Sequence, residues 1–447
     1  MKKIRNVIIA MSLVICFLFC FTACSYGDNP TGSNSPFASN IPTPTSSPTP
    51  SRRPTGTVLK DSQFPAIYVN TSGVPITSKE IYIPASISMS NTEKEYEFSN
   101  VSAEIRGRGN STWILEKKPY RIKFATKQTM LDSGYKAKNW TLIANHSDKA
   151  LLRNYSAYYL ASQLDGLYFS PHTWFVDLYL NNEYQGVYML CDHIQENEGR
   201  VDVDFNANPE DCEYLIEWDE RILDEGVENV DYVVVGGIPF AVKFPDIEDM
   251  TPGHIADVKS FLTEVNTAIN NADYTEIQKL IDINSFVDFF LVQELFKNVD
   301  VGLSSVFMQI KKIEGQRKIV MGPVWDFDIS CGNADYMDYG PTGIWAQRKN
   351  NWFAKLMTTP FADTVVLRWN EIKGNQIESM LSEIEYMSTH YQSSFENNFV
   401  RWNVLGRYTW PNPAEVIAIK TYMAQVEYLL DWLGTRIDWL DDYYNKL

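Results

Sequence analysis

Polar and apolar residues alternate along much of the first half of the chain, whereas apolar residues recur at helical spacing in most of the second half. Short alternating runs, such as those of residues 66–69 and 81–83, are typical of strands with one buried face. Asn181-Asn182 between two apolar runs predicts a hairpin turn. We expect strands within 64–124, 174–191, 213–218, 231–244 and around 305–326, and helices at about 147–163, 251–297 and from about 351 onward.

This order of elements, strands first and helices later, favours an α+β body with two lobes and a cleft between them. Residues 58–250 would form a strand-rich lobe, and residues 251–447 a mainly helical lobe that carries the acidic motif described below. The ~390 residues after position 57 are enough to bury a sizeable core. A hydrophobic content of 45% agrees with that expectation.

The C-terminal segment carries clear helix signals. Asn412 as N-cap, Pro413 at the first helical position and Glu415 three residues after the cap predict that a helix begins there. Apolar residues then recur at helical spacing. Periodic aromatic residues of this kind are usually core, so we favour burial over a sugar-binding platform. The apolar residues are Leu429, Leu430, Trp432, Leu433, Ile437, Trp439 and Leu440.

The first 24 residues have the form of a secretory signal, in which basic residues precede an apolar run from Val7 to Phe21. Small residues before Cys24 resemble a bacterial lipoprotein cleavage site, and Cys24 would then be the lipid-modified first residue of an extracytoplasmic, membrane-anchored protein. Ordinary cleavage nearby is the alternative. Residues 25–57 are rich in Pro, Ser and Thr and predict a disordered tether that spaces the domain from a membrane.

Net charge and cysteine usage exclude several classes of protein. The chain has 39 Lys and Arg against 56 Asp and Glu, a net charge of −17, which argues against nucleic acid and against nonspecific binding to anionic membrane. After Cys24 the only cysteines are Cys191, Cys212 and Cys331, with no CxxC spacing. A disulfide framework and a zinc site are therefore not expected.

The segment Met321-Gly-Pro-Val-Trp-Asp-Phe-Asp328 is the most informative in the chain. If the backbone stays extended there, Asp326 and Asp328 project to the same side with Cα atoms ~7 Å apart. Magnesium usually binds one or two carboxylates together with substrate phosphates. The pair is a candidate metal site, although two solvated acids at a strand end would look the same in the sequence.

Residues 106–123 reverse the acidic charge of the chain. The stretch has a single acid, Glu116, and two glycines, Gly107 and Gly109, that would let a ligand approach the backbone. A glycine turn with solvated basic edges is the plain alternative for such a loop. In an acidic protein that also has a metal-type acid pair, the stretch points to an anion site. Its basic residues are Arg106, Arg108, Lys117, Lys118, Arg121 and Lys123.

These motifs resemble the CotH kinases, a family named after a spore coat protein. The resemblance spans about residues 60 to 400, and the ordered set of blocks is more specific than any one of them. It implies an atypical protein-kinase-like fold that uses ATP and Mg2+ or Mn2+ to phosphorylate serines of a protein substrate. The blocks are RGRGNSTW at 106–113, KKPYRIKF at 117–124, HSDKALLRNYSAYYLA at 146–161, VDLYLNNEYQGVYMLCDHI at 176–194, ELFKNVDVGLSSVFMQI at 294–310 and GPVWDFDISCGN at 322–333.

The resemblance assigns roles to three aspartates. Asp300 matches the catalytic-loop aspartate, which would accept the proton of the substrate hydroxyl or orient that hydroxyl. Asp326 matches the metal-binding aspartate, with Asp328 as a second carboxylate. Ser304 and Ser305 replace the asparagine that often follows the catalytic aspartate, and Ser304 could still ligate metal through its hydroxyl. The HRD, DFG and APE signatures of ordinary kinases are absent, so these roles rest on the family match.

The strand KKPYRIKF matches the position of the phosphate-pairing lysine. Lys118 shares a face with Ile122, whereas Lys123 shares one with Arg121, and the sequence does not decide which face lines the cleft. We take Lys118 as the candidate. Many family members carry Glu where this chain has Asp192, so the acidic partner of the lysine would be Asp192, Glu196 or neither. The expected nucleotide-binding residues are Arg106, Arg108, Lys118, Arg121, Lys123 and Asp192.

Three function classes follow from these observations. The first is a surface-tethered, ATP- and metal-dependent protein kinase that contacts the membrane only through its lipid anchor. The second is a catalytically weak or inactive binding or scaffold module of the cell surface with the same fold, either an adhesin or part of a carbohydrate-degrading complex. Its support is the lipid anchor, since ATP is scarce outside a cell, and the altered positions Asp192 and Ser304. The third is a hydrolase that uses aspartates as acid and base, which needs carboxyl groups ~5 to 9.5 Å apart. The basic strand argues against a neutral glycan as its substrate.

Overall fold

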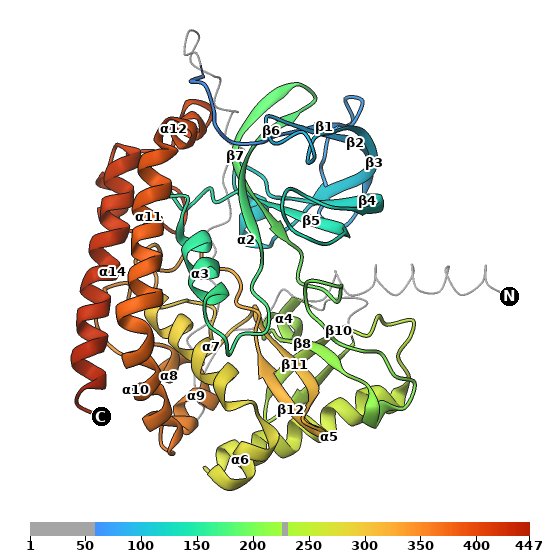
Figure 1. Ribbon diagram of the computed structural model, residues 1–447, viewed down its shortest axis with the longest axis vertical. Helices are drawn as coiled ribbons and strands as arrows, with labels where there is room; N and C mark the ends of the chain where they lie inside the picture. Colours follow the sequence, from blue (N-terminus) through green and yellow to red (C-terminus); the bar gives the residue numbers. More distant parts are fainter. Residues whose placement is uncertain (1–58, 226–230) are drawn as a thin grey trace, which may run out of the picture. The chain divides into compact units, whose positions relative to one another are not determined.

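Seven strands in the first half of the chain close into a barrel. The computed structural model describes residues 59–225 and 231–447, which belong to one compact unit (Figure 1). The strand order is β1-β2-β3-β4-β5-β7-β6, with parallel pairing only where β1 meets β6. The strands are β1 (Ala66–Asn70), β2 (Ile83–Ser90), β3 (Phe98–Gly107), β4 (Tyr120–Gln128), β5 (Ala137–Ile143), β6 (Thr173–Leu180) and β7 (Glu183–Asp192).

The alternation of β4 decides which of its side chains face the interior. Tyr120, Ile122 and Phe124 are buried in the core of the barrel, together with apolar residues of the neighbouring strands. Because successive side chains of a strand point to opposite faces, Arg121 and Lys123 project from the outer surface. The basic face of β4 therefore lies outside the barrel.

A second sheet, of order β12-β11-β8-β10-β9, lies below the barrel in Figure 1. Strand β11 pairs with β8, so the sheet joins segments from both sides of residue 250. The expected boundary at that residue does not separate sheet from helices. The strands are β8 (Tyr214–Trp218), β9 (Tyr232–Val235), β10 (Ile238–Phe244), β11 (Val306–Ile313) and β12 (Gln316–Met321).

Helices dominate the described chain after residue 346. Helix α7 is the central one, because its residues from Ser285 to Phe296 are all buried, and α11 and α14 run side by side on the left of Figure 1. The α-helices are α2 (Ser111–Ile114), α3 (Arg153–Ser162), α4 (Arg221–Glu225), α5 (Pro252–Asn270), α6 (Tyr274–Leu280), α7 (Ile283–Phe296), α8 (Ala346–Lys349), α9 (Asn351–Leu356), α10 (Phe361–Ile372), α11 (Glu378–His390), α12 (Gln392–Arg401), α13 (Ala414–Ala418) and α14 (Tyr422–Tyr444). Short turns of other helix types lie at Pro209–Asp211 and Lys373–Ile377.

Two helix starts differ from the sequence prediction. Helix α3 begins at Arg153 rather than near 147, because the Asp148 carboxylate accepts hydrogen bonds from the backbone N–H of Ala150 and Arg153 and holds a turn there. Near Asn412 the short helix α13 does begin, at Ala414 with Pro413 as its N-cap, but it ends at Ala418. The long C-terminal helix starts separately and is capped by Thr421, whose side chain accepts from Ala424 N–H. Asn412 is instead buried in tertiary contacts described below.

Other local predictions are confirmed. The hairpin between β6 and β7 turns at Asn181 and Asn182, which have left-handed φ values of 49° and 67°. The apolar stripe of α14 is core, with Leu429, Trp432 and Leu440 buried. In the part of the chain that the structure describes, the cysteines are free and buried, and no helix is long and apolar enough to cross a membrane. The signal segment, Cys24 and the tether lie outside the described residues.

Candidate active site

The acidic motif lies in a loop and not on a strand. Strand β12 ends at Met321, and Asp326 has a left-handed φ of 66°, so the expectation of an extended chain through Asp328 was wrong. Helix α3 holds this loop. The backbone N–H of Asp326 donates to Tyr158 Oη at 3.2 Å, and that of Phe327 donates to Asn154 Oδ1 at 2.6 Å. The Tyr158 ring also stacks on the preceding Trp325, with centroids 5.6 Å apart.

Three aspartates form an acid cluster, which we define as Asp300, Asp326 and Asp328. Burial raises the pKa of Asp328 well above its usual range, and the charges of Asp326, Asp148 and Asp300 raise it further. Burial and then Asp326 raise the pKa of Asp300 to about 7. The charge of Asp326 acts on both Asp300 and Asp328, so the tertiary structure places these carboxyl groups within electrostatic range of one another.

Asp300 is positioned by the turn that follows α7. Its backbone N–H donates to Asn298 Oδ1 at 3.1 Å, and its carbonyl accepts from the N–H groups of Leu303 and Ser304. Ser304 is buried, and its hydroxyl oxygen has no hydrogen-bond partner among the described residues. A buried hydroxyl without a partner is costly, and a bound ligand would satisfy it.

The acid cluster fits a hard divalent cation that also binds a phosphate ligand. No group of three Asp, Glu, His or Cys side chains in the described ranges is arranged to hold a metal ion by itself. Magnesium does not require such a cage, since it commonly takes one or two carboxylates, waters and substrate phosphates. Asp326, Asp328 and the unpaired Ser304 hydroxyl are the residues that would hold it.

Opposite in charge to the acid cluster is an arginine cluster, which we define as Arg106, Arg108, Arg121 and Arg200. Arg106 and Arg121 are directly paired across β3 and β4. Burial lowers the pKa of Arg121 to about 10, and the positive charges of Arg106, Arg108 and Arg200 contribute to the lowering. The same four guanidinium groups, together with burial, lower the pKa of the half-buried His193 well below its usual value.

The arginine cluster has donors left over. Arg106 Nε, Arg121 Nε and Arg200 Nη2 are buried without a hydrogen-bond partner among the residues that the structure describes. Unpaired buried donors on mutually repelling cations are unfavourable in the free protein, and an anion would satisfy both the charge and the hydrogen bonds. Phosphate is one anion with the charge and the acceptor oxygens to do so.

Asp192 pairs with an arginine rather than with a lysine. Its Oδ1 accepts from Arg200 Nε at 2.7 Å, and its Oδ2 lies 2.9 Å from His172 Nδ1. The hydroxyl of Tyr135 also donates to Asp192. The sequence left open whether Asp192 is the acidic partner of the candidate lysine. In the structure the Asp192 carboxylate orients Arg200 of the arginine cluster, and it is not the partner of Lys118 or Lys123.

The two candidate lysines have different surroundings. Lys118 Nζ donates to Trp113 O at 2.6 Å and lies 5.3 Å from the centroid of the Trp113 ring. Trp113 in turn packs on Gly107, where a Cβ would overlap its ring. In this geometry Lys118 supports the glycine loop, and its pairing with a phosphate stays a prediction. Lys123 is exposed on the same outer face as Arg121, with Nζ 5.7 Å from the Tyr82 ring centroid.

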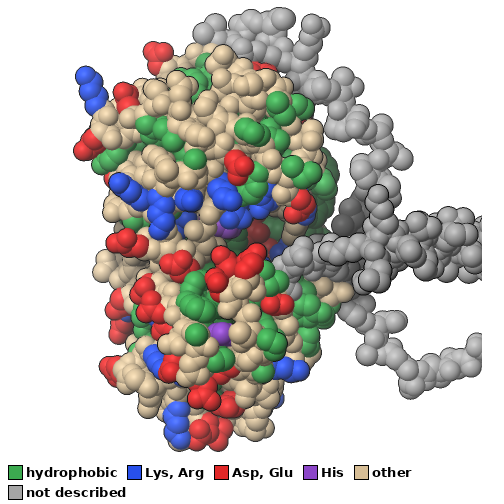
Figure 2. Space-filling model, turned by 90° about the vertical axis from the view of Figure 1, so that its right-hand side faces the viewer, with side chains coloured by type: hydrophobic (Ala, Val, Ile, Leu, Met, Phe, Trp, Pro, Cys, Tyr) green, Lys and Arg blue, Asp and Glu red, His purple; other side chains and the backbone are tan. Residues whose placement is uncertain are grey.

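Arg108 connects the two clusters. Its guanidinium lies 5.5 Å from the centroid of the Trp325 ring, immediately before the acid loop, and its charge opposes the rise in the pKa of Asp328. On the face drawn in Figure 2, Lys and Arg side chains form a band across the middle, and Asp and Glu side chains gather directly below the band. A ligand with phosphates and a divalent cation matches this pairing of charges.

Sequence reasoning missed several residues of the site. Arg200 has no local motif, because tertiary folding alone brings it to β3 and β4, whereas His193 lies in the matching block at 176–194 but had no role assigned to it. Arg221 was also missed. Its Nε donates to Asp219 Oδ1 at 2.9 Å, and its charge lowers the pKa of Asp300. For Asn154 and Tyr158, the matching block at 146–161 was a signal, but it did not indicate their contacts with the acid loop.

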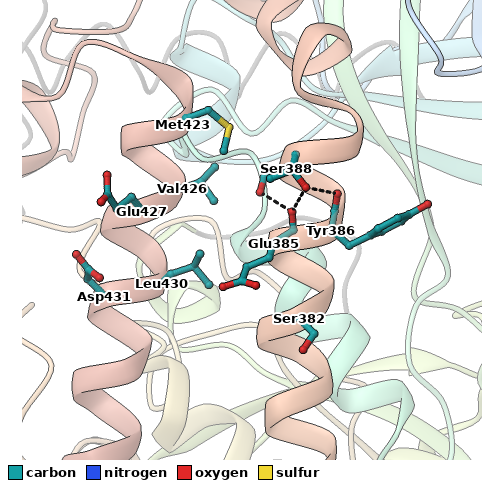
Figure 3. Close-up of a pocket in the computed structure, with 10 residues that line it drawn as sticks. Ser382, Glu385, Tyr386, Ser388, Met423, Val426, Glu427, Leu430 and Asp431 are labelled. Atoms are coloured by element: carbon teal, nitrogen blue, oxygen red, sulfur yellow. Dashed lines mark hydrogen bonds between the residues drawn. The ribbon is translucent and has the colours of Figure 1, made fainter.

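A separate groove, with a volume of about 690 Å3, lies between α11 and α14. Figure 3 shows Met423, Val426 and Leu430 on one side and Glu385 and Ser382 on the other. None of the residues that line it belongs to the acid or arginine cluster. Its size alone therefore does not make it the catalytic candidate.

Comparison with known proteins agrees with the motifs. The model of the CotH kinase protein family matches residues 105–440. Since the match covers most of the chain, the chain belongs to this family and is a kinase-like protein of the CotH type. A search of curated proteins finds no match.

The raised carboxyl pKa values predict a pH-dependent effect of metal. When the pKa of a carboxyl group is higher in the folded than in the unfolded protein, the folded protein loses stability as pH rises from the unfolded-state pKa through the folded-state pKa. For Asp300 this window runs from 3.8 to about 7. Between pH 6 and pH 8, we expect the chelator-treated wild type to lose a few degrees more of melting temperature than Asp300→Asn does, because the variant lacks the titrating carboxyl group. Thermal unfolding checks this, and Mg2+ or Mn2+ should abolish the difference. Parallel pH profiles for the two chelator-treated proteins would contradict it.

Proposed function

We propose that the chain is an ATP- and divalent-metal-dependent kinase that phosphorylates serines of a protein substrate. The observation that carries the proposal is the arginine cluster, with its buried unpaired donors, connected through Arg108 to the acid cluster. Phosphoryl transfer depends mainly on positioning and on neutralising charge, and these two clusters supply both.

In this proposal, separate residues bind the phosphates, hold the metal and activate the serine. Arg106, Arg121 and Arg200 would bind phosphate oxygens, while Asp326 and Asp328 would hold Mg2+ or Mn2+. When bound, the metal would neutralise charge on the phosphates. Asp300 would orient the serine hydroxyl and accept its proton, for which a pKa of about 7 is well suited.

The order of strands supports a kinase-like arrangement. Strands β3-β4-β5-β7-β6 form an antiparallel run, and α3 lies between β5 and β6 in the sequence. Protein kinases place helix αC after a strand of their upper lobe, and its position controls the metal-binding aspartate. Here α3 contacts the acid loop through Asn154 and Tyr158. The helix contains no Asp or Glu, so it cannot supply the glutamate of the usual Lys–Glu pair.

A scaffold with the same fold is the second candidate, favoured by the engagement of Lys118 with Trp113 rather than with a phosphate site. Nucleotide binding separates the two. At 100 times its dissociation constant, ATP with Mg2+ or Mn2+ should stabilise the protein by ~2.7 kcal/mol, a melting shift of a few degrees for a body of this size. No shift with any nucleotide and metal would favour the scaffold. An equal shift without metal would argue against metal binding by Asp326 and Asp328.

We also propose that Cys24 carries a lipid that anchors the protein outside the cytoplasm, with residues 25–57 as the tether. The support is the signal-like segment ending at Cys24. In a bacterial host the protein should enter the membrane fraction, and Cys24→Ala should remove lipid attachment. Labelling with a palmitate analogue measures this, with Cys212→Ala as the control. Unchanged labelling of Cys24→Ala would falsify the anchor.

A further inference from the structure

A small cavity of about 220 Å3 lies between α3 and the start of β6. One wall is formed by Tyr155 and Tyr159 of α3, whose rings stack with centroids 6.2 Å apart. The other is formed by His172 and Trp174, whose rings stack with centroids 6.1 Å apart and an interplanar angle of 13°. The cavity is thus bounded by two pairs of aromatic rings from different elements.

A single carboxylate lines the cavity, together with the His172 ring. Asp132 is the only Asp or Glu among the ten lining residues, and none of the ten is Lys or Arg. Asp132 Oδ1 accepts from Trp174 Nε1 at 2.6 Å, while the Asp132 side chain remains exposed. The hydrogen bond fixes the indole, and the carboxylate adds negative potential beside the aromatic rings.

The walls are held in place by contacts behind them. Tyr155 Oη donates to Glu383 of α11 at 2.7 Å, and Tyr159 Oη lies 3.2 Å from Ser379 Oγ of the same helix. His172 Nδ1 lies 2.9 Å from Asp192 Oδ2. Because these polar ends are already engaged, the rings need little further ordering on binding, which favours affinity.

We propose that this cavity binds an organic cation of the quaternary or alkylated ammonium class. Aromatic faces attract such cations through the ring quadrupole, and the apolar alkyl groups of the cation fill the space between rings. The Asp132 carboxylate supplies the countercharge, and the absence of Lys and Arg from the lining disfavours anions. This site is separate from the proposed phosphate and metal site, and it does not depend on kinase activity.

The cavity nevertheless lies next to the acid loop. Tyr158 contributes to its lining, and the Tyr158 hydroxyl accepts from the backbone N–H of Asp326. A bound cation would therefore sit one side chain away from the loop that carries Asp326 and Asp328.

Isothermal titration of the full chain with choline chloride tests the proposal, with 3,3-dimethylbutan-1-ol as an uncharged ligand of the same shape. We expect choline to bind with a millimolar dissociation constant and the alcohol to bind about tenfold more weakly, since cation–π attraction and Asp132 act only on the charged ligand. Nucleotide is absent from this experiment, so its outcome is independent of the proposed kinase function.

Two variants and a control locate the site. Asp132→Asn keeps an acceptor for Trp174 but removes the charge. It should weaken the binding of choline about fivefold and leave the affinity for the alcohol unchanged. Trp174→Leu should abolish choline binding. Tyr386→Leu, in the groove between α11 and α14, should have no effect, and circular dichroism verifies that each variant is folded. Equal affinities for choline and the alcohol, no choline binding, or wild-type affinity in both Asp132→Asn and Trp174→Leu would overturn the proposal.

Discussion

Arg121→Met is expected to weaken binding of ATP with Mg2+ by about 10- to 100-fold, because a charge-assisted hydrogen bond contributes about 1.5 to 3 kcal/mol. The same change should not destabilise the free protein. A cation whose folded pKa lies below its unfolded value costs stability at every pH below the folded value, and the cost is relieved only as pH rises from about 10 toward 12.5. Methionine removes that cost at neutral pH and retains much of the side-chain volume.

Fluorescence or calorimetric titration with nucleotide, together with thermal unfolding of the free protein, measures both effects. Lys123→Met is the matched control, because Lys123 lies two residues further along the same face of β4 but is exposed. Its charge is screened by solvent, and we expect a change in affinity below about threefold. Wild-type affinity in Arg121→Met would remove the arginine cluster from the nucleotide site. A melting temperature several degrees below wild type would show that Arg121 is a structural cation instead.

Asp300→Asn and Asp326→Asn are expected to lose activity for different reasons. Asparagine at 326 removes a charged metal ligand, and metal-dependent nucleotide affinity should fall by more than the roughly 100-fold that loss of an outer-sphere partner can cost. Asparagine at 300 should leave nucleotide affinity within about threefold of wild type and lower turnover by about 10² to 10⁴, the range for loss of a general base.

Steady-state kinetics and nucleotide titration, carried out on the same preparations, separate the two roles. The pH profile adds a second distinction. Wild-type kcat/KM should rise with pH through the titration of Asp300, and Asp300→Asn should lack that rise. Asp363→Asn, an exposed acid on α10, serves as the control and should match wild type. If both site variants retained wild-type turnover, neither aspartate would have the assigned role.

Local sequence patterns were sufficient to predict most of the helices and strands. They failed where contacts between distant parts of the chain determine where an element begins or with which strand it pairs. The Asn181-Asn182 turn fixes the β6–β7 hairpin through left-handed backbone positions that asparagine tolerates. In contrast, Asn412 has a good local cap signal, yet its side chain donates to Ser147 O and Asn333 Oδ1, and the long helix is capped at Thr421. The pairing of β11 with β8 joins distant segments, and no local pattern encodes that register.

In the candidate site, too, some residues could be predicted from local motifs and others are placed only by tertiary contacts. The family motifs indicated Asp300, Asp326 and Asp328, and the structure clusters them, but the extended geometry assumed for Asp326 was wrong because α3 holds the loop in another conformation. Arg200 reaches the arginine cluster only through tertiary folding, where Asp192 orients it. Which face of β4 is buried follows from the barrel interior, and alternation alone does not identify it, since either face of an isolated strand can be the buried one.

The central claim is that the acid cluster and the arginine cluster together transfer phosphate from ATP to serine. Incorporation of label from the γ-phosphate of ATP, with Mg2+ or Mn2+, into the protein itself or a serine-rich acceptor tests it most directly. The account predicts label on serine in the wild type that is lost with chelator and in Asp326→Asn. No transfer by wild-type protein that binds metal–nucleotide, or equal transfer by wild type and Asp326→Asn, would contradict it.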